Sequence, residues 1–142
     1  MSEREGREPP PGFQPSRGRG PYSTHNGPFY DRVTEGRFER GFFVLDRHCN
    51  SFGIVHGGMV CTFLDALLAG EAYRAAGRVG VTINLSTDFL SAARRGDWVQ
   101  GDAQVTRVAG ELVFVEGRAH ARGRDLARAH AIFKLMSPRR GG

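Results

Sequence analysis

The alternation of apolar and polar residues predicts one long helix followed by a strand. From Gly57 to Ala76 apolar residues recur at intervals of three and four, as they do on one helical face, and Gly77 follows where a C-terminal cap belongs. After this helix the period falls to two, because Val81, Ile83 and Leu85 alternate with polar neighbours. We therefore expect a helix of about twenty residues that leads into a strand.

Four further strands complete the predicted sheet. They cover Phe38–Leu45, Trp98–Val108, Glu111–Ala121 and Leu126–Met136. Alanines at alternate positions of the last two strands would let a helix pack closely on the sheet. The order β-α-β-β-β-β predicts an α+β architecture, in which one long central helix is wrapped by a mostly antiparallel sheet of about five strands. The edges of such a sheet invite pairing with another subunit.

The distribution of proline predicts where the ordered domain begins and ends. Six of the seven prolines lie in the first 28 residues, together with several glycines, and none lies between residues 29 and 137. Proline is excluded from central strands and helix interiors. We therefore expect a disordered tail over residues 1–28, a single domain over 29–137 and a short C-terminal tail over 138–142. Deletion of residues 2–27 should then change stability and turnover little.

Composition narrows the class of protein. No apolar window is long enough for a membrane helix and the polar N-terminus lacks a secretory signal, so a cytoplasmic protein is expected. The formal net charge of +5 arises from residues spread along the chain, with no basic run of the kind that binds nucleic acid. The two cysteines, Cys49 and Cys61, lack C-x-x-C spacing, which favours reduced thiols.

The polar, glycine-rich segment that leads into the helix is a candidate site. The first amides of a helix lack intrahelical partners and the helix dipole adds positive potential, so an oxygen that becomes anionic would be stabilised there, above all by the unshielded amide of Gly57. Asp65 lies among apolar residues of the helix, where it either binds structural partners or faces a cleft as a base. Taken alone, His56 and Asn50 fit structural turn residues as well.

Two other chemistries have less support. Zinc ligation would draw on His48, Cys49, His56 and Asp65, but their spacing matches none of the common ligand patterns, so no metal and no other cofactor is expected. The His-Gly-Gly step is similar to an esterase oxyanion loop, yet the G-x-S-x-G nucleophile of that family is missing. This argues against a serine hydrolase.

The spaced combination of residues resembles a known family. At these residues and spacings the sequence resembles the hotdog-fold acyl-CoA thioesterases of the phenylacetate-degradation (PaaI-like) subgroup. The residues are Asn50, Gly53, His56, Gly57, Gly58 and Asp65. The likeness extends from about Phe38 to Met136. It includes Thr82 after the helix, the Phe89-Leu90 step and the Arg94-Arg95-Gly96 turn.

This resemblance implies a homodimer, often paired into a tetramer, that hydrolyses the thioester of acyl-CoA. By analogy Asp65 is the general base or nucleophile, and the Gly57 amide is the oxyanion donor. Asn50 and His56 would orient the thioester and the attacking water, with Thr82 as a further positioning residue. The resemblance also implies that the loop of one subunit faces the helix aspartate of the other.

The resemblance suggests further substrate contacts at Gly53 and Gly58. Arg94 and Arg95 could bind CoA phosphates, because the planar guanidinium suits phosphate, or they could belong to a solvated loop. Family members often have a proline near the turn at residues 91–95, and its absence here leaves the shape of that turn open.

Two other functions remain open at this stage. Hotdog hydratases resemble one another in an Asp-x4-Asn-Pro-x-His pattern. Here Asp46 lies four positions before Asn50, which leaves three residues between them instead of four; Ser51 replaces the proline, and the histidine comes later, at His56. The second open function is that of a non-catalytic acyl-CoA-binding or sensing protein, since a fold does not fix a function. Short-chain, medium-chain and aromatic acyl groups are all open.

Overall fold

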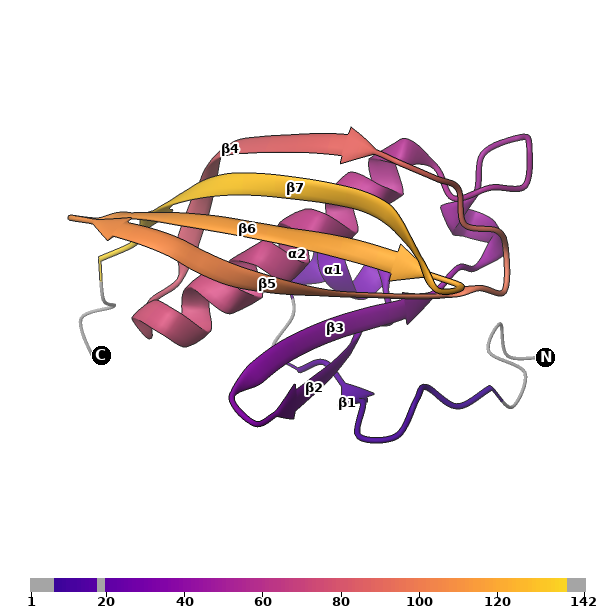
Figure 1. Cartoon of the computed structure of the whole chain (residues 1–142), viewed down its shortest axis with the longest axis horizontal. Coiled ribbons are helices and arrows are strands. Elements are labelled where there is room, and N and C mark those ends of the chain that lie inside the picture. The colour runs from indigo at the N-terminus through magenta and orange to yellow at the C-terminus, as the bar shows by residue number, and fades with distance from the viewer. Residues whose placement is uncertain (1–6, 18–19, 138–142) are drawn as a thin grey trace.

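One long helix packs against a single antiparallel sheet in the computed structural model, which describes residues 7–17 and 20–137. The helix, α2, spans Gly57–Ala76. The strand order in the sheet is β1-β2-β3-β5-β6-β7-β4, so that β1 and β4 form opposite edges (Figure 1). This arrangement confirms the predicted architecture of a central helix wrapped by an antiparallel sheet.

The sheet has seven strands rather than the five predicted. The bounds are β1 Gln14–Pro15, β2 Tyr30–Thr34, β3 Arg37–Phe43, β4 Gly80–Phe89, β5 Trp98–Ala109, β6 Leu112–Ala121 and β7 Arg124–Leu135. A short helix, α1, spans Pro21–Asn26, and a 3-10 turn spans Asp46–His48. The two additional strands, β1 and β2, come from the N-terminal part of the chain, where their pattern is too short to be recognised.

The predicted bounds of α2 are confirmed. His56 has an extended backbone and caps the first turn, and Gly77 ends the helix with a φ of 69° and a bond from its N–H to the Tyr73 carbonyl. A left-handed residue at this position favours glycine, which has no Cβ to clash. The face of α2 toward the sheet includes Phe63, Leu64 and other residues with no exposed surface.

Two glycines let α2 lie close to the sheet. A Cβ on Gly101 of β5 would stand 2.8 Å from the side chain of Leu67, and one on Gly117 of β6 would stand 2.8 Å from that of Leu68. Both leucines are fully buried. Because a larger residue at either glycine would push the helix away, these positions fix how deeply α2 sits in the sheet.

The N-terminal segment differs from the disordered tail that was expected. Phe13 is only 5% exposed, and its ring packs edge-on against Trp98 with the centroids 5.1 Å apart. The Arg32 guanidinium lies over the same ring, and Gln14–Pro15 pairs with β2. A buried aromatic residue therefore holds this proline-rich segment on the domain. Residues 1–6, 18–19 and 138–142, which include the predicted C-terminal tail, lie outside the described residues.

Arg40 joins the N-terminal segment to α2. Its side chain is 5% exposed, and its Nε donates to Asp31 Oδ1 at 2.6 Å while an Nη donates to Asp31 Oδ2 at 3.1 Å. Its other Nη donates to the carbonyl of Ala66 on α2. Ser16 also donates to Asp31, at 2.9 Å. A buried charge is tolerated when it is paired in this way, so the guanidinium connects three elements through fixed geometry.

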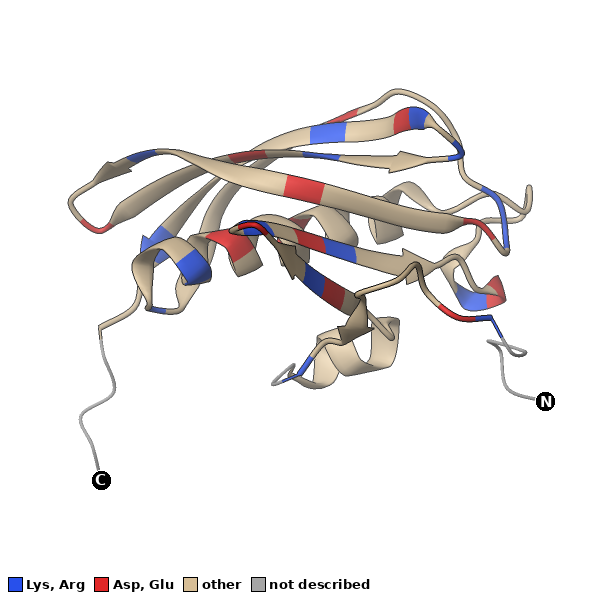
Figure 2. Ribbon diagram, turned by 60° about the horizontal axis from the view of Figure 1, so that its bottom comes forward, with Lys and Arg blue, Asp and Glu red and all other residues tan. Residues whose placement is uncertain are grey.

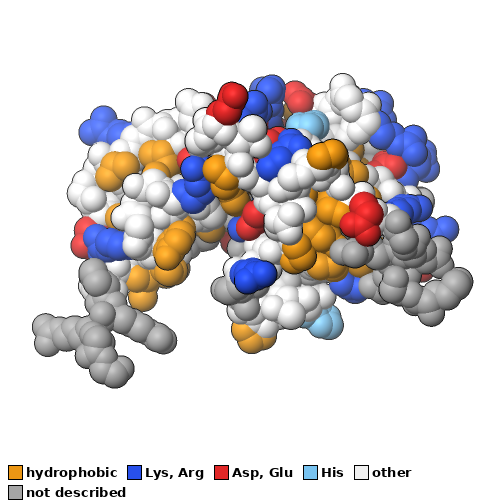
Figure 3. Space-filling model, turned by 90° about the horizontal axis from the view of Figure 1, so that it is seen from below, with side chains coloured by type: hydrophobic (Ala, Val, Ile, Leu, Met, Phe, Trp, Pro, Cys, Tyr) orange, Lys and Arg blue, Asp and Glu red, His pale blue; other side chains and the backbone are white. Residues whose placement is uncertain are grey.

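Basic and acidic residues are interspersed along the strands. Along the strands Lys and Arg positions lie next to Asp and Glu positions, and α1 stands out below the sheet (Figure 2). Hydrophobic side chains show between charged ones on the underside of the molecule (Figure 3). No helix within the described ranges is long and apolar enough to cross a membrane.

Candidate active site

The segment before α2 folds into a tight, hydrogen-bonded loop. Cys49 and Val55 form an isolated antiparallel bridge, and the Asn50 N–H donates to the Ile54 carbonyl at 2.9 Å. Between them Gly53 has a φ of 77°, which glycine adopts readily. The Val55 N–H donates to the Ala93 carbonyl at 2.8 Å, so the loop is also attached to the chain after β4.

The side chain of Asn50 is oriented by this loop. Its Oδ1 accepts from the N–H of Phe52 at 2.9 Å and from that of Ile54 at 3.4 Å. With the oxygen occupied, the Nδ2 group is the part of the amide that can act on a ligand. Asn50 therefore offers donors.

His56 caps the first turn of α2. Its Nδ1 accepts from the N–H of Gly58 at 2.8 Å, and its side chain is exposed. A neutral imidazole that accepts at Nδ1 carries its proton at Nε2. Like Asn50, His56 therefore presents a donor to the solvent-facing side of the loop.

The Gly57 amide is the third donor. Within the described part of the chain, no acceptor is bonded to this N–H, as is usual for the first residue of a helix. The Phe89 ring lies beside it: a Cβ on Gly57 would stand 3.5 Å from the ring edge, and the ring is 56% exposed. The sequence alone assigned Phe89 no role in the site, because only the fold shows that its ring lies next to a helix terminus.

The Asp65 carboxylate lies two turns further along α2, beside β4. Thr82 of β4 donates its hydroxyl hydrogen to Asp65 Oδ1 at 2.6 Å, and Asp65 is half-buried. This contact brings together two of the predicted site residues. The hydrogen bond leaves Oδ2 as the oxygen that can take a proton or attack a carbonyl.

The donors and the carboxylate of one chain do not meet. Eight residues of α2 separate Gly57 from Asp65, which corresponds to about 12 Å along the axis. A reacting carbonyl needs its base or nucleophile within about 3–3.5 Å while its oxygen contacts the oxyanion donor. The structure therefore unites Asn50, His56 and Gly57 in one group, and Asp65 with Thr82 in another.

The two predicted phosphate-binding arginines lie beside the loop. Ile54 forms a bridge with Arg94, whose N–H donates to Asp97. Arg95 is paired with Asp46 at 2.9 Å, and both of these side chains are largely exposed. Among the described residues the Arg94 guanidinium has no acidic partner, so it is free to contact an anion.

Cys49 and His48 are poorly suited to chemistry. Burial, followed by the nearby Asp46 carboxylate, raises the pKa of the Cys49 thiol, which disfavours the reactive thiolate. His48 is buried; its Nδ1 accepts from the Leu45 N–H at 3.0 Å, and its Nε2 lies 2.7 Å from the Asn26 carbonyl. No group of three His, Cys, Asp or Glu side chains that could hold a metal occurs in residues 7–17 and 20–137.

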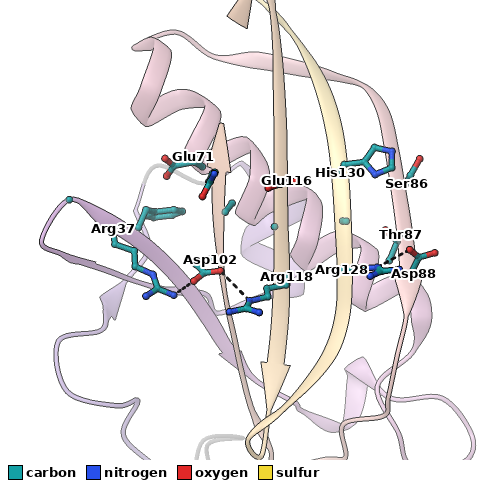
Figure 4. Close-up of a pocket in the computed structure, with 16 residues that line it drawn as sticks. Arg37, Glu71, Ser86, Thr87, Asp88, Asp102, Glu116, Arg118, Arg128 and His130 are labelled. Atoms are coloured by element: carbon teal, nitrogen blue, oxygen red, sulfur yellow. Dashed lines mark hydrogen bonds and ion pairs between the residues drawn. The ribbon is translucent and has the colours of Figure 1, made fainter. Parts of the chain in front are cut away.

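A surface pocket lies elsewhere, across the sheet. It is lined by residues of β3, β4, β5, β6 and β7 and by Glu71 at the end of α2 (Figure 4). Asp102 pairs there with Arg37 and, at 4.0 Å, with Arg118, while Arg128 pairs with Asp88 at 3.1 Å. None of the predicted site residues lines this pocket, and its three arginines are neutralised by acidic neighbours.

Comparison with known proteins identifies relatives along most of the chain. The Thioesterase superfamily model matches residues 52–128, which is more than half of the chain. The Pseudomonas aeruginosa protein named "Putative esterase PA0474" is 33% identical over 129 residues, covering 89% of this chain and 96% of its own length. The range matched by the family model includes Gly57, Asp65 and Thr82, and Asn50 lies just before it.

Solved structures share the fold. A phenylacetic acid degradation-related protein from Ralstonia eutropha is 25% identical, with a TM-score of 0.74, and the match covers 84% of this chain and 94% of that one. The BH2602 protein from Bacillus halodurans, solved with CoA, is 22% identical with a TM-score of 0.75, and the match covers 87% and 83%. The PaaI-like resemblance is thus confirmed: the chain belongs to the Thioesterase superfamily and has the hotdog fold.

Proposed function

We propose that the protein is an acyl-CoA thioesterase, which hydrolyses an acyl-CoA to the free acid and CoA. Family membership supports thioester chemistry in general, and the related BH2602 protein was solved with CoA. The arrangement of donors and carboxylate supports the finer assignment. Three hydrogen-bond donors at the start of α2 and one carboxylate beside β4 are what hydrolysis of a thioester needs.

Each group has a role in the proposed reaction. The Gly57 N–H, at the positive end of the helix dipole, stabilises the thioester oxygen as it becomes anionic. Asn50 and His56 orient the thioester and the water through Nδ2 and Nε2. Asp65 either takes a proton from the attacking water or attacks the carbonyl carbon itself, forming an anhydride that water then opens. In both routes the C–S bond breaks and CoA leaves as a thiol once it has gained a proton.

The observation that carries the proposal is the separation of about 12 Å between Gly57 and Asp65 along one helix. Both can act on one carbonyl only if they come from different subunits. Asp65 lies beside β4, which is a sheet edge, so pairing of two β4 edges about a two-fold axis would bring the partner subunit's loop toward Asp65. The proposed enzyme is therefore a dimer with two shared sites.

Several residues support substrate binding in this proposal. Gly53 and Gly58 keep the loop and the helix start free of side chains where the thioester would pass. Thr82 holds the Asp65 carboxylate in place. Arg94, and Arg95 after it leaves Asp46, would contact the phosphates of CoA.

Mixed dimers test the shared site. Asp65→Ala should lower kcat by about 10²- to 10⁴-fold, because a positioned base is lost, and Asn50→Ala homodimers should also be impaired at both sites. When the two variants are refolded together in equal amounts, half of the dimers are mixed, and each mixed dimer has one site without any substitution. Thiol release should then recover to about a quarter of the wild-type value.

The control separates the mechanism from general damage. Glu116→Ala removes an exposed carboxylate from β6, far from the loop, and should leave kcat within about twofold. If mass spectrometry proves that mixed dimers form and activity stays at the mean of the two variants, the shared site is wrong. If the wild-type protein hydrolyses no acyl-CoA at all, the thioesterase assignment is wrong.

A further inference from the structure

The N-terminal segment that contains α1 is attached to the domain at several points. His48 Nε2 lies 2.7 Å from the Asn26 carbonyl, and Arg47 donates to the carbonyl of Gly27. Directly after it Phe29 is 3% exposed and packs against Phe63 of α2, with ring centroids 6.1 Å apart. These contacts fix the position of α1 relative to α2.

Tyr22 of α1 extends this attachment to the outer face of α2. Its hydroxyl lies 2.8 Å from the hydroxyl of Thr62, and its carbonyl accepts from Asn26 Nδ2 at 2.8 Å. The side chain is nevertheless 65% exposed. Tyr22 is thus a large aromatic ring that is held at its tip, while its faces remain open to solvent.

Thr62 is a neighbour of Asp65 on the helix surface. Residues three apart on a helix have their Cβ atoms about 5–6 Å apart. The Tyr22 hydroxyl therefore contacts a residue that lies one helical turn from Asp65. The next outward position, Ala69, has a small side chain, so no other large side chain of α2 stands beside Asp65 on this side until Tyr73.

We propose that Tyr22 forms one wall of the acyl-binding site and determines which acyl groups are hydrolysed. The inference rests on the proposed function, because it takes Asp65 as the group that acts on the thioester. In this proposal an acyl chain attached to a carbonyl at Asp65 runs along the outer face of α2, and the ring of Tyr22 closes this face at the level of Thr62. Such a wall limits length or bulk through contact with apolar atoms of the acyl group.

The test compares substrates rather than overall rates. Tyr22→Ala, Tyr22→Phe and the wild type are assayed for kcat/KM with acetyl-, hexanoyl-, decanoyl- and phenylacetyl-CoA. In Tyr22→Ala the ratio of decanoyl-CoA to acetyl-CoA should rise about tenfold, since pocket contacts of this size discriminate by roughly 10- to 200-fold. Tyr22→Phe retains the ring and should shift the ratio by less than about threefold.

His25→Ala is the matched control. His25 is exposed and lies in the last turn of the same short helix, so its loss tests whether any change in α1 alters the substrate profile. Its ratios should equal those of the wild type. A Tyr22→Ala profile that stays parallel to the wild-type profile overturns the inference, whether or not activity falls throughout, because Tyr22 would then only tether α1. A wild-type protein without acyl-CoA hydrolysis rejects the proposed function first and this inference with it.

Discussion

The two edges of the sheet are built differently. At one edge β1 has only two residues, and the chain before it is packed down by Phe13. At the other edge β4 runs for ten residues, no strand of the described chain lies beyond it, and it exposes Val81, Ile83 and Phe89 at 48%, 56% and 56%. One edge is short and lies next to a buried aromatic anchor, whereas the other is long and apolar.

The difference identifies the edge that is open to pairing with another chain, as the proposed dimer requires. A long, flat, hydrophobic edge strand offers unpaired N–H and C=O groups to any other strand, and natural proteins usually protect such an edge. Among the described residues, β1 has such protection, because it is short and ends in a proline, whereas β4 has none. Since Asp65 lies beside the unprotected edge, the surface proposed for pairing is also the surface at which the active site would be completed.

The largest effect is expected from a charge on the β4 edge. Ile83→Glu places a carboxylate on a side chain that is already exposed in the single chain, so the fold should remain. Across a two-fold interface, however, two such carboxylates would face or approach each other and oppose pairing. We expect a monomer by light scattering and at least about a 100-fold loss of kcat/KM, because each site would lose its oxyanion donor from the partner subunit.

Val33 provides the control at the opposite edge. It lies on β2 beyond the residues that pair with β1, and it is 58% exposed, close to the value for Ile83. Val33→Glu should change neither the assembly nor the rate. If Val33→Glu dissociates the protein and Ile83→Glu does not, the two edges have been assigned the wrong way round.

A smaller effect is expected at the protected edge. Phe13→Ala removes a buried ring that packs on Trp98, and we expect a loss of about 2 kcal/mol of unfolding free energy, below the roughly 3–5 kcal/mol typical of such truncations because the segment can detach locally. Urea denaturation measures this loss. Glu8→Ala, an exposed change nearby, should cost less than about 0.5 kcal/mol. If Phe13→Ala leaves the urea midpoint unchanged, the packing of Phe13 adds no stability. Deletion of residues 2–27 would then again be expected to be harmless.

The smallest effect concerns the ion pairs near the start of β4. The hydrogen bond from Lys134, and then that from Arg78, hold the pKa of the Glu111 carboxyl below its ordinary value of 4.5. A carboxyl whose pKa is lowered in the folded state adds stability above its unfolded pKa, and this contribution disappears as the pH falls through the folded pKa. Glu111→Gln should therefore lower Tm by about 1–2 °C at pH 7. At about pH 3 the two proteins should melt closer together, and a constant difference at both pH values would contradict this cause.

The sequence predicted the central elements of the fold because they carry long, regular patterns. The bounds of α2 agree with the predicted helix, and β5, β6 and β7 begin and end within two residues of the predicted strands. The strands β1 and β2 could not be predicted in the same way. They are held by contacts from distant residues, such as Trp98 on Phe13 and Arg40 on Asp31, which no local pattern reveals.

The sequence indicated individual residues of the candidate site but not how they lie relative to one another. The spacing of Gly57 and Asp65 on a helix could be read from the sequence, and so could the polar loop with Asn50. The bond from Thr82 to Asp65 depends on how β4 lies against α2, with a register shift between Thr82 and Asn84. The exposed ring of Phe89 beside Gly57 likewise depends on the three-dimensional path of β4.

The close fit of α2 onto the sheet at Gly101 and Gly117 has a consequence for the release of product. Leu67 and Leu68 are fully buried and fill the space between the helix and these two glycines, so an acyl chain cannot enter there. In the proposed reaction, an acid formed at Asp65 would lie on the outward side of the helix, in contact with water along part of its length. It could therefore leave without separation of the helix from the sheet, so the slow opening of a buried chamber need not limit turnover.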